Sequence, residues 1–400
     1  MSIVGKRLNK VKPSPTLAIA KKASELKASG VNIIDLALGE PDFDTPDNVK
    51  EAAIAGIRAG KTKYTAVDGM PELKRAIISK LEKENELTYN PKQIIVSTGA
   101  KQVIYNALVA SLDIGDEVII PAPYWVSYPD MVALAGGDTV YVECNGLSNF
   151  KLTANQLKKV ITKKTKWVIL NSPSNPTGSA YNYNEMKALT DVLLDYPNVY
   201  ILSDDIYEHI TYDNFKFVTP AQVEPKLYDR TLVVNGVSKS YAMTGWRIGY
   251  GAGPEELIKA MSIVQSQSTS SPSSISQIAA IEALVGPQDF ITNNKALFQK
   301  RRDLVINALN QIDLLKCNSP EGAFYLFPEC KKMFGKKTPE GKILQNSSDV
   351  VEYFLSEAKV STVHGSAFGI EGFFRISYAT SEALLTEACN RIKDACAKLS

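Results

Sequence analysis

The chain has 400 residues, and its 45 basic and 43 acidic side chains give no electrostatic reason to expect a nucleic acid or an anionic membrane as partner. Its length predicts two domains, or one large domain with an appended lobe, and no apolar run approaches the roughly 18 residues that span a bilayer. Five scattered cysteines without a CxxC pair favour a reducing, cytoplasmic location, and only two histidines weaken the case for a zinc site or a Ser-His-Asp hydrolase.

The first elements along the chain are weakly marked. Basic residues open the sequence without the apolar stretch of a secretory signal, and Pro13 and Pro15 break any early helix. We expect residues 1–46 to pack with the C-terminal part of the chain.

From residue 47 to residue 287, strand and helix patterns alternate. Six short runs are almost wholly apolar, which is typical of strands covered on both faces. Amphipathic helices lie between several of them, for example at residues 101–112 and 184–196. This alternation predicts a large α/β domain over residues 47–287, with a three-layer, mostly parallel sheet. The six runs are residues 117–123, 139–144, 166–173, 199–205, 231–237 and 247–253.

After residue 287 the pattern changes. A long helical stretch at 288–312 leads into apolar runs that include 323–329 and 373–379, and then into a final helix. We expect a smaller α+β domain made of residues 1–46 plus 288–400.

A glycine-rich run at residues 249–254 imitates a dinucleotide-binding turn. The last glycine of G-x-G-x-x-G would fall at Pro254, and no acidic residue ends a following strand about 20 residues later. We therefore expect no Rossmann domain and no NAD-dependent oxidoreductase.

Lys239 follows the apolar run 231–237, and Arg247 opens the next one. Burial and a neighbouring cation both disfavour a protonated lysine, so Lys239 would be suited to Schiff-base chemistry. A solvated loop lysine is the alternative from this pattern alone.

A lysine that binds a cofactor as an imine needs an anion cradle, a carboxylate for a ring nitrogen and a flat surface for the ring. The strand–turn–helix pattern at Gly99, Ala100 and Lys101 offers backbone N–H groups for a phosphate, although an ordinary strand–helix joint has the same pattern. Asp204 ends a buried strand, where a helix cap is the alternative, and Trp125 stands at a strand exit.

Two further groups stand near predicted strands. Asn175 opens an Asn-Pro-x-Gly turn after a strand. Arg375 lies inside an aromatic and apolar strand, where a guanidinium needs an anionic partner. That partner is either a structural acid or a ligand carboxylate.

These residues together resemble the class I aminotransferases of pyridoxal-phosphate fold type I, over nearly the whole chain. Three further motifs are similar to the bacterial aspartate aminotransferase branch, namely PYWVSYP (123–129), STGAKQ (97–102) and QSQSTSSPSSISQ (265–277). The motifs that carry the class resemblance are LGEPDFDTP (38–46), KYTAVDGMPELK (63–74), NPTG (175–178), SDDIY (203–207), SKSYAMTGWRIGY (238–250) and FFRISYAT (373–380).

The resemblance implies pyridoxal 5'-phosphate as cofactor. Lys239 would bind it covalently and move the α-proton of the substrate. Asp204 would pair with the ring nitrogen, and Tyr207 and Asn175 would bind the phenolic oxygen. Trp125 would stack on the ring.

For the phosphate, the resemblance implies the turn Gly99–Lys101 together with Arg247. Many relatives carry a serine three residues before the lysine, where this chain has Gly236. Ser238 or Ser240 would compensate for it, or neither does.

For the substrate, the resemblance implies that Arg375 binds the α-carboxylate, helped by Asn175 and the backbone of Gly39. The better-known branch binds the distal carboxylate with an arginine from the partner chain, but the corresponding segment 262–274 contains none. Candidates for this role are Lys101, Lys12 and Thr16, with a solvated N-terminal lysine as the alternative for Lys12.

We therefore expect an aspartate aminotransferase that uses 2-oxoglutarate as acceptor, with prephenate as a hypothesised further substrate. Tyr64 would reach the phosphate of the partner subunit, which implies a homodimer with composite sites. An aromatic or broad-specificity aminotransferase is the alternative enzyme. A non-catalytic regulator on the same fold would need a fused DNA-binding module, and the pattern leaves no unassigned stretch for one.

Overall fold

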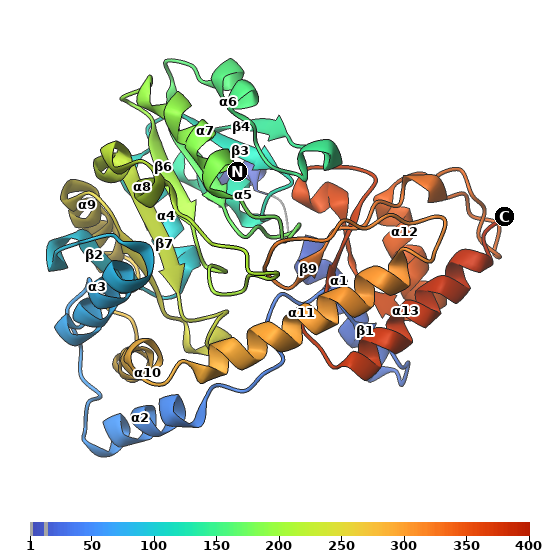
Figure 1. The fold of residues 1–400 in the computed structure, drawn as a ribbon, viewed down its shortest axis with the longest axis horizontal. Helices are drawn as coiled ribbons and strands as arrows, with labels where there is room; N and C mark the ends of the chain where they lie inside the picture. The colour runs from blue at the N-terminus through green and yellow to red at the C-terminus, as the bar shows by residue number, and fades with distance from the viewer. Residues whose placement is uncertain (1–2, 12–14) are drawn as a thin grey trace.

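The computed structural model describes residues 3–11 and 15–400, and a seven-stranded sheet lies at its centre (Figure 1). The strands follow the order β2-β8-β7-β6-β5-β3-β4. The sheet is mostly parallel, as predicted, and β8 runs antiparallel to both of its neighbours. The strands are β2 (Ile94–Ser97), β3 (Glu117–Ala122), β4 (Asp138–Glu143), β5 (Thr165–Asn171), β6 (Tyr200–Asp204), β7 (Thr231–Gly236) and β8 (Gly249–Ala252).

Helices cover both faces of this sheet. In β5, Trp167 and Ile169 pack with α4, α5 and α9, whereas Val168 and Leu170 pack with α6 and α7. Both faces are buried, so the strand is a continuous apolar run in the sequence. The predicted three-layer α/β class is confirmed. The helices of this part are α2 (Asp47–Arg58), α3 (Pro71–Asn85), α4 (Ala100–Ser111), α5 (Ser127–Ala135), α6 (Ala154–Val160), α7 (Tyr183–Leu194), α8 (Pro220–Val223), α9 (Glu255–Ser266) and α10 (Ser274–Val285).

Side-chain caps fix where several helices begin. Asn182 and Glu185 form a capping box at the start of α7, and Thr153 and Gln156 form one at the start of α6. At the start of α4 no side chain caps the helix; Gly99 instead turns the backbone with a φ of 82°. Glycine adopts this conformation without strain, and the turn leaves the first N–H groups of α4 available.

The second lobe contains a three-stranded antiparallel sheet, β11-β12-β9, and a parallel pair, β1 and β10. Because Ile34 of β1 pairs with Val360 of β10, an N-terminal strand lies beside C-terminal elements (Figure 1). The helix α1 begins at Pro15, a residue suited to the first helical position. The elements are α1 (Pro15–Ala28), β1 (Ile34–Asp35), α11 (Asp289–Leu309), β9 (Tyr325–Leu326), α12 (Ser347–Tyr353), β10 (Val360–Ser361), β11 (Val363–His364), β12 (Phe374–Ser377) and α13 (Glu382–Ala397).

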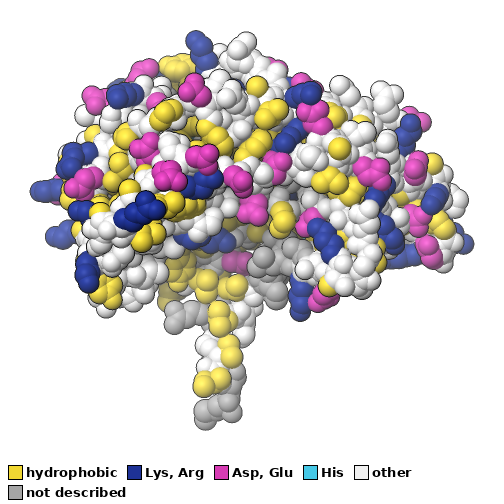
Figure 2. All heavy atoms as spheres, turned by 90° about the horizontal axis from the view of Figure 1, so that it is seen from below, with side chains coloured by type: hydrophobic (Ala, Val, Ile, Leu, Met, Phe, Trp, Pro, Cys, Tyr) yellow, Lys and Arg dark blue, Asp and Glu magenta, His cyan; other side chains and the backbone are white. Residues whose placement is uncertain are grey.

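Short helical turns connect these elements. They are the 3-10 turns η1 (Lys6–Lys10), η2 (Pro91–Gln93), η3 (Gly146–Ser148), η4 (Pro225–Arg230), η5 (Thr244–Trp246), η6 (Lys331–Met333) and η8 (Gly365–Phe368), and the π-turn η7 (Phe354–Ala358). On the face drawn in Figure 2, acidic and basic side chains are interspersed over both lobes. Within residues 3–11 and 15–400, no helix is long and apolar enough to cross a membrane.

Candidate active site

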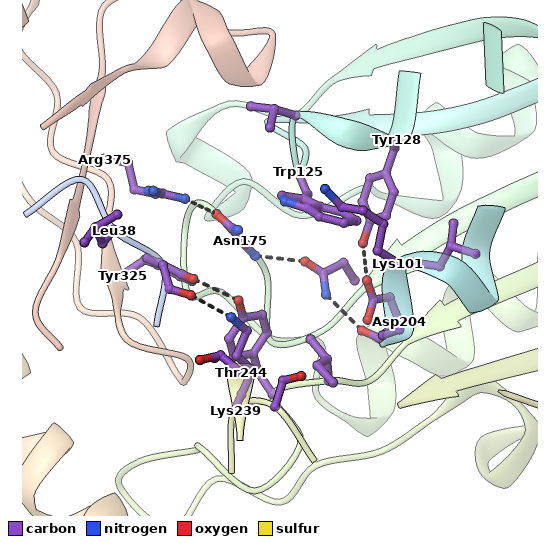
Figure 3. Close-up of a pocket in the computed structure, with 18 of the residues that line it drawn as sticks. Leu38, Lys101, Trp125, Tyr128, Asn175, Asp204, Lys239, Thr244, Tyr325 and Arg375 are labelled. Carbon is purple, nitrogen blue, oxygen red and sulfur yellow. Dashed lines mark hydrogen bonds between the residues drawn. The ribbon is translucent and has the colours of Figure 1, made fainter. Parts of the chain in front are cut away.

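A cavity of about 350 Å³ lies where the parallel strands of the large sheet end (Figure 3). Parallel neighbours share one direction, so the residues that follow β5, β6 and β7 meet at one edge of the sheet. Asn175, Asp204 and Lys239 line the cavity from these three strands. The second lobe closes the other side with Tyr325 and Arg375.

Lys239 points its amine into this cavity. Its Nζ donates a hydrogen bond to the carbonyl oxygen of Gly39 at 2.6 Å. Burial, with a smaller contribution from the cations Arg375 and Arg247, lowers the pKa of the Lys239 amine to about 8, against an opposing effect of Glu40 and Asp204. A neutral, nucleophilic amine is therefore accessible near neutral pH.

Asp204 ends β6 and is buried in the cavity wall. Its Oδ2 accepts a hydrogen bond from the Tyr128 hydroxyl of α5 at 2.6 Å, whereas its Oδ1 has no partner among the described residues. Burial raises the pKa of the Asp204 carboxyl to about 6, opposed by hydrogen bonds from Tyr128 and the Ile206 N–H. Because Asp204 lines the cavity, its unpartnered oxygen is in a position to accept a hydrogen bond from a cationic donor of a ligand.

The start of α4 forms an anion cradle in the wall of the cavity. A Cβ at Gly99 would overlap the Arg247 guanidinium, so this cation lies directly on the glycine turn. A Cβ at Gly249 would likewise overlap the backbone N of Ala100. The glycine-rich run that imitates a dinucleotide fingerprint thus lets β8 pack tightly on the cradle.

Lys101 and Trp125 lie beside this cradle. The Lys101 Nζ is 4.8 Å from the centroid of the Trp125 ring, and both side chains line the cavity. Burial, and secondarily the charge of Arg247, lowers the pKa of the Lys101 amine. An anion in the cavity would relieve this repulsion between the two cations.

Arg375 is buried at the end of the cavity formed by the second lobe. Its Nη1 donates to Asn175 Oδ1 at 2.9 Å and its Nη2 to the Ala37 carbonyl at 2.6 Å. Its Nε has no partner among the described residues, and the clamp includes no carboxylate. The ligand alternative stated above for Arg375 is therefore favoured over a structural acid.

The sequence matches the profile of the aminotransferase class I and II family over residues 31–392. A protein of Rickettsia felis named probable aspartate/prephenate aminotransferase is 62% identical over 100% of this chain and 98% of its own. The aspartate/prephenate aminotransferase of Cereibacter sphaeroides is 57% identical, with 100% of both chains covered.

Solved structures of aspartate aminotransferases are similar to this chain in fold and in sequence. The aspartate aminotransferase of Rhizobium meliloti has a TM-score of 0.98 and 56% identity, with 100% of both chains covered. That of Thermus thermophilus, solved with maleate, has a TM-score of 0.91 and 41% identity over 99% of this chain and 100% of its own.

This chain belongs to the class I and II aminotransferases. The aminotransferase depends on pyridoxal phosphate, and the cavity fits this cofactor on features of its own. The unpartnered Asp204 Oδ1 suits a protonated ring nitrogen, and the Gly99–Arg247 cradle suits the phosphate. The amine of Lys239 lies in the same cavity.

Some expected residues are not part of this cavity. Tyr64 is 95% exposed and does not line it. Lys12 lies outside the described residues, and of Thr16 only its backbone place in α1 is described. Ser238 lines the cavity, but Ser240 is hydrogen bonded to the His209 ring instead.

Close packing explains why position 236 is a glycine and not the serine found in many relatives. A Cβ there would lie 2.8 Å from the Ile248 carbonyl oxygen and 3.0 Å from Gly249 Cα. A serine would therefore push β7 away from β8, and this aminotransferase replaces it with the residue that fits.

Tyr128, Tyr325 and Asn171 are cavity residues that were not predicted from the sequence and that hold other site residues by hydrogen bonds. Tyr128 orients Asp204, and Tyr325 contacts Tyr207. Asn171 accepts from the Asn175 N–H at 2.8 Å and donates to the Asp204 carbonyl at 2.9 Å, which links the two strand ends (Figure 3). The motif PYWVSYP contained the signal for Tyr128, which lies three residues after Trp125, in the first turn of α5.

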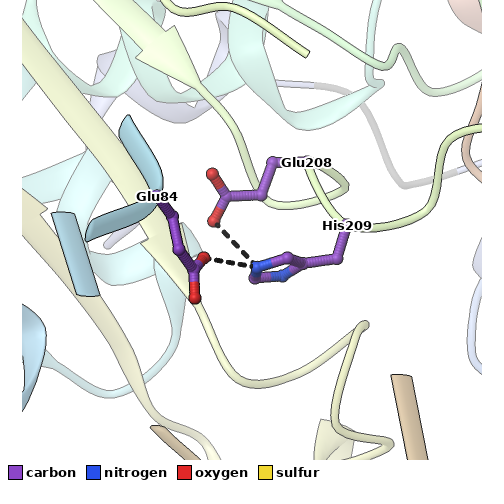
Figure 4. A group of neighbouring side chains, drawn as sticks. All are labelled: Glu84, Glu208 and His209. Atoms are coloured by element: carbon purple, nitrogen blue, oxygen red, sulfur yellow. Dashed lines mark hydrogen bonds and ion pairs between the residues drawn. The ribbon is translucent and has the colours of Figure 1, made fainter. Parts of the chain in front are cut away.

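A cluster of charged side chains lies outside the cavity and includes Glu208 and His209, the two residues that follow Tyr207. Glu84, Glu208 and His209 lie within 4.8 Å of one another, a spacing that also suits a metal ion (Figure 4). Here, however, Lys80 already provides the cation, since its buried ammonium contacts both Glu208 and Glu84. Glu208 also accepts from Asn85 and Asn235. Burial raises the pKa of the Glu208 carboxyl, but the charges of Lys80 and His209 and the hydrogen bonds from Lys80 and Asn85 together lower it to about 2.

Replacing Lys80 by methionine is expected to destabilise the protein by about 3–5 kcal/mol, because it leaves Glu208 charged and buried without its cation. The urea midpoint, followed by tryptophan fluorescence at fixed cofactor concentration, measures this loss. Lys83→Met, at an exposed position of the same helix, is the control and should change stability by less than about 0.5 kcal/mol. Equal midpoints for the two variants would contradict the role of Lys80.

Proposed function

We propose that this aminotransferase transfers the amino group of L-aspartate to 2-oxoglutarate, producing oxaloacetate and L-glutamate. One observation carries the proposal: the Lys239 amine faces a single cavity that has an unpartnered carboxylate at one wall and guanidinium groups at both ends. A cofactor with a cationic ring nitrogen and a phosphate, and a substrate with a carboxylate, match these charges.

Lys239 is the catalytic residue in this proposal. When bound, the cofactor supplies a protonated ring that withdraws electrons from the substrate α-carbon. The Nζ of Lys239 binds the cofactor and then takes and returns the α-proton, for which its lowered pKa of about 8 is suited. Asp204 holds the proton on the ring nitrogen with its Oδ1.

The remaining cofactor contacts position the ring. The N–H groups of Ala100 and Lys101 and the Arg247 guanidinium would hold the phosphate, with Ser238 beside them. Gly99 contributes the turn, since its own N–H donates to the Ser97 carbonyl. Trp125 stacks on the ring. Tyr207 and Asn175 donate hydrogen bonds to its phenolic oxygen.

Arg375 binds the substrate α-carboxylate through two parallel hydrogen bonds, helped by Asn175 and the backbone of Gly39. The Asn175 bond at 2.9 Å holds the guanidinium in place before the substrate arrives. Such preorganisation reduces the entropy lost on binding.

Lys101 binds the distal carboxylate of the substrate, with Lys12 and Thr16 as further contributors. Lys101→Ala should lower kcat/KM for aspartate by about 10- to 150-fold, since a hydrogen bond to a charged group contributes about 1.5–3 kcal/mol. The value for phenylalanine, which has no distal carboxylate, should change little. Equal losses for both donors would assign Lys101 to the cofactor phosphate alone.

The working unit is a cytosolic homodimer. Tyr64 supports this proposal, because a tyrosine 95% exposed beside the cofactor motifs has room to reach a second chain. The helix α2 presents Ile57, which is 56% exposed, on its outer face. We also propose the domain limits given above, with residues 47–287 as the large domain and residues 1–46 plus 288–400 as the small one.

A steady-state panel tests the substrate assignment. Aspartate, glutamate and phenylalanine serve as donors against 2-oxoglutarate, oxaloacetate and prephenate. Aspartate with 2-oxoglutarate should give the highest kcat/KM. Formation of arogenate from prephenate would add the second activity, and phenylalanine as the best donor would favour the aromatic enzyme instead.

A further inference from the structure

Tyr325 is a cavity residue that has no role in the proposed function described above. It lies in β9 opposite Ser377 of β12, and Arg375 is two residues from Ser377 on the same face of that strand. This register places the Tyr325 ring under the clamp, with the Arg375 Cζ 4.7 Å from the ring centroid. The side chain is fully buried and lines the cavity.

The hydroxyl groups of Tyr325 and Tyr207 are 2.9 Å apart, and the two rings are almost perpendicular. Within the described part of the chain, each hydroxyl has the other as its hydrogen-bond partner. A pair of hydroxyls uses one of its two protons internally. The other proton is therefore available to a third group, and the direction of the shared bond decides which tyrosine offers it.

Two features favour Tyr325 as the donor within the pair. A Cβ at Gly39 would lie 2.8 Å from Tyr325 Oη, so the hydroxyl packs closely against the backbone of Gly39 and leaves no room for a ligand atom on that side. Burial raises the pKa of the Tyr325 hydroxyl, and the positive charge of Arg375 opposes this rise and so favours release of the Tyr325 proton toward an acceptor. Burial raises the pKa of the Tyr207 hydroxyl too, and Arg375 opposes that rise as well, but the carboxylate of Asp204 disfavours negative charge on Tyr207.

We propose that Tyr325 is a positioning residue that donates its proton to Tyr207 and thereby directs the Tyr207 proton into the cavity, toward the phenolic oxygen of the cofactor. The inference rests on the proposed function, in which Tyr207 binds that oxygen. Linked hydroxyls polarise one another, so a Tyr207 that accepts a bond donates a stronger one.

The test is the pH titration of the visible absorption band of the purified holoenzyme. A hydrogen bond to the phenolic oxygen lowers the proton affinity of the neighbouring lysine linkage. Tyr325→Phe weakens that bond, so the midpoint of the absorption change should rise by about 0.5–1 pH unit. Tyr378→Phe is the control, because that buried hydroxyl donates to the Ala323 carbonyl, and its midpoint should equal that of the unchanged protein.

A double-mutant cycle isolates the pathway. In a Tyr207→Phe background, Tyr325→Phe should produce no further shift. An unchanged midpoint in Tyr325→Phe would overturn the proposal, and so would a fall, because a fall means that Tyr207 donates to Tyr325. A protein without any visible band would instead contradict the cofactor site itself, so the two failures are distinguishable.

Discussion

Replacing Lys239 by alanine is expected to lower kcat by about 10⁴-fold or more, because the same amine binds the cofactor and moves the α-proton. The variant should fold, since Lys239 makes one hydrogen bond, to the Gly39 carbonyl, at the edge of a cavity. Stopped-flow measurement of single turnovers separates this chemical step from product release.

A covalent readout accompanies the kinetics. Borohydride should fix the cofactor to the unchanged protein, and mass spectrometry should place the added mass on Lys239. The alanine variant should gain no mass, whereas Lys83→Ala, at an exposed site, should label normally. A Lys239→Ala protein whose visible band still bleached with aspartate would refute the assignment.

The second large effect is expected at Asp204. Asp204→Asn keeps the volume and the hydrogen bond from Tyr128 but removes the negative charge next to the ring nitrogen. Loss of one preorganised electrostatic contact typically costs about 10²–10³ in kcat. The variant should also release pyridoxal phosphate more readily, which equilibrium dialysis measures.

Asp205→Asn is a matched control in the neighbouring position. Asp205 is also buried, but burial raises the pKa of its carboxyl to about 8, so it is mainly neutral at pH 7. Ser203 donates to it at 2.6 Å, and it does not line the cavity. Its kcat should therefore stay within a few-fold of the unchanged protein, and equal losses at both positions would argue for a general packing defect.

The strand-end residues were predictable because parallel strands are visible as apolar runs. Lys239 follows such a run and Asp204 ends the strand formed by another, and the sheet topology brings the ends of these strands together. The resemblance to the aminotransferases then assigned their roles. In the same way, Gly99 at a strand–helix junction indicated the cradle.

The residues that were missed act across elements far apart in the sequence. Tyr325 lies in an apolar run that fits a core strand, and only the pairing of β9 with β12 brings it beneath Arg375. Tyr128 and Asn171 hold their partners by single hydrogen bonds, which leave no periodic pattern. Gly249 and Gly251 stand out in the sequence because they imitate a dinucleotide-binding turn. Their actual role, close packing of β8 on α4, is visible only in the structure.

The contact of Gly249 with the start of α4 also has a consequence for biosynthesis. The phosphate cradle needs the turn at Gly99, but its cation is Arg247 and its support is β8, about 150 residues later in translation. A growing chain that ends before Arg247 has the turn without the charge that neutralises a phosphate. We therefore expect the phosphate to be held fully only after β8 has paired between β2 and β7.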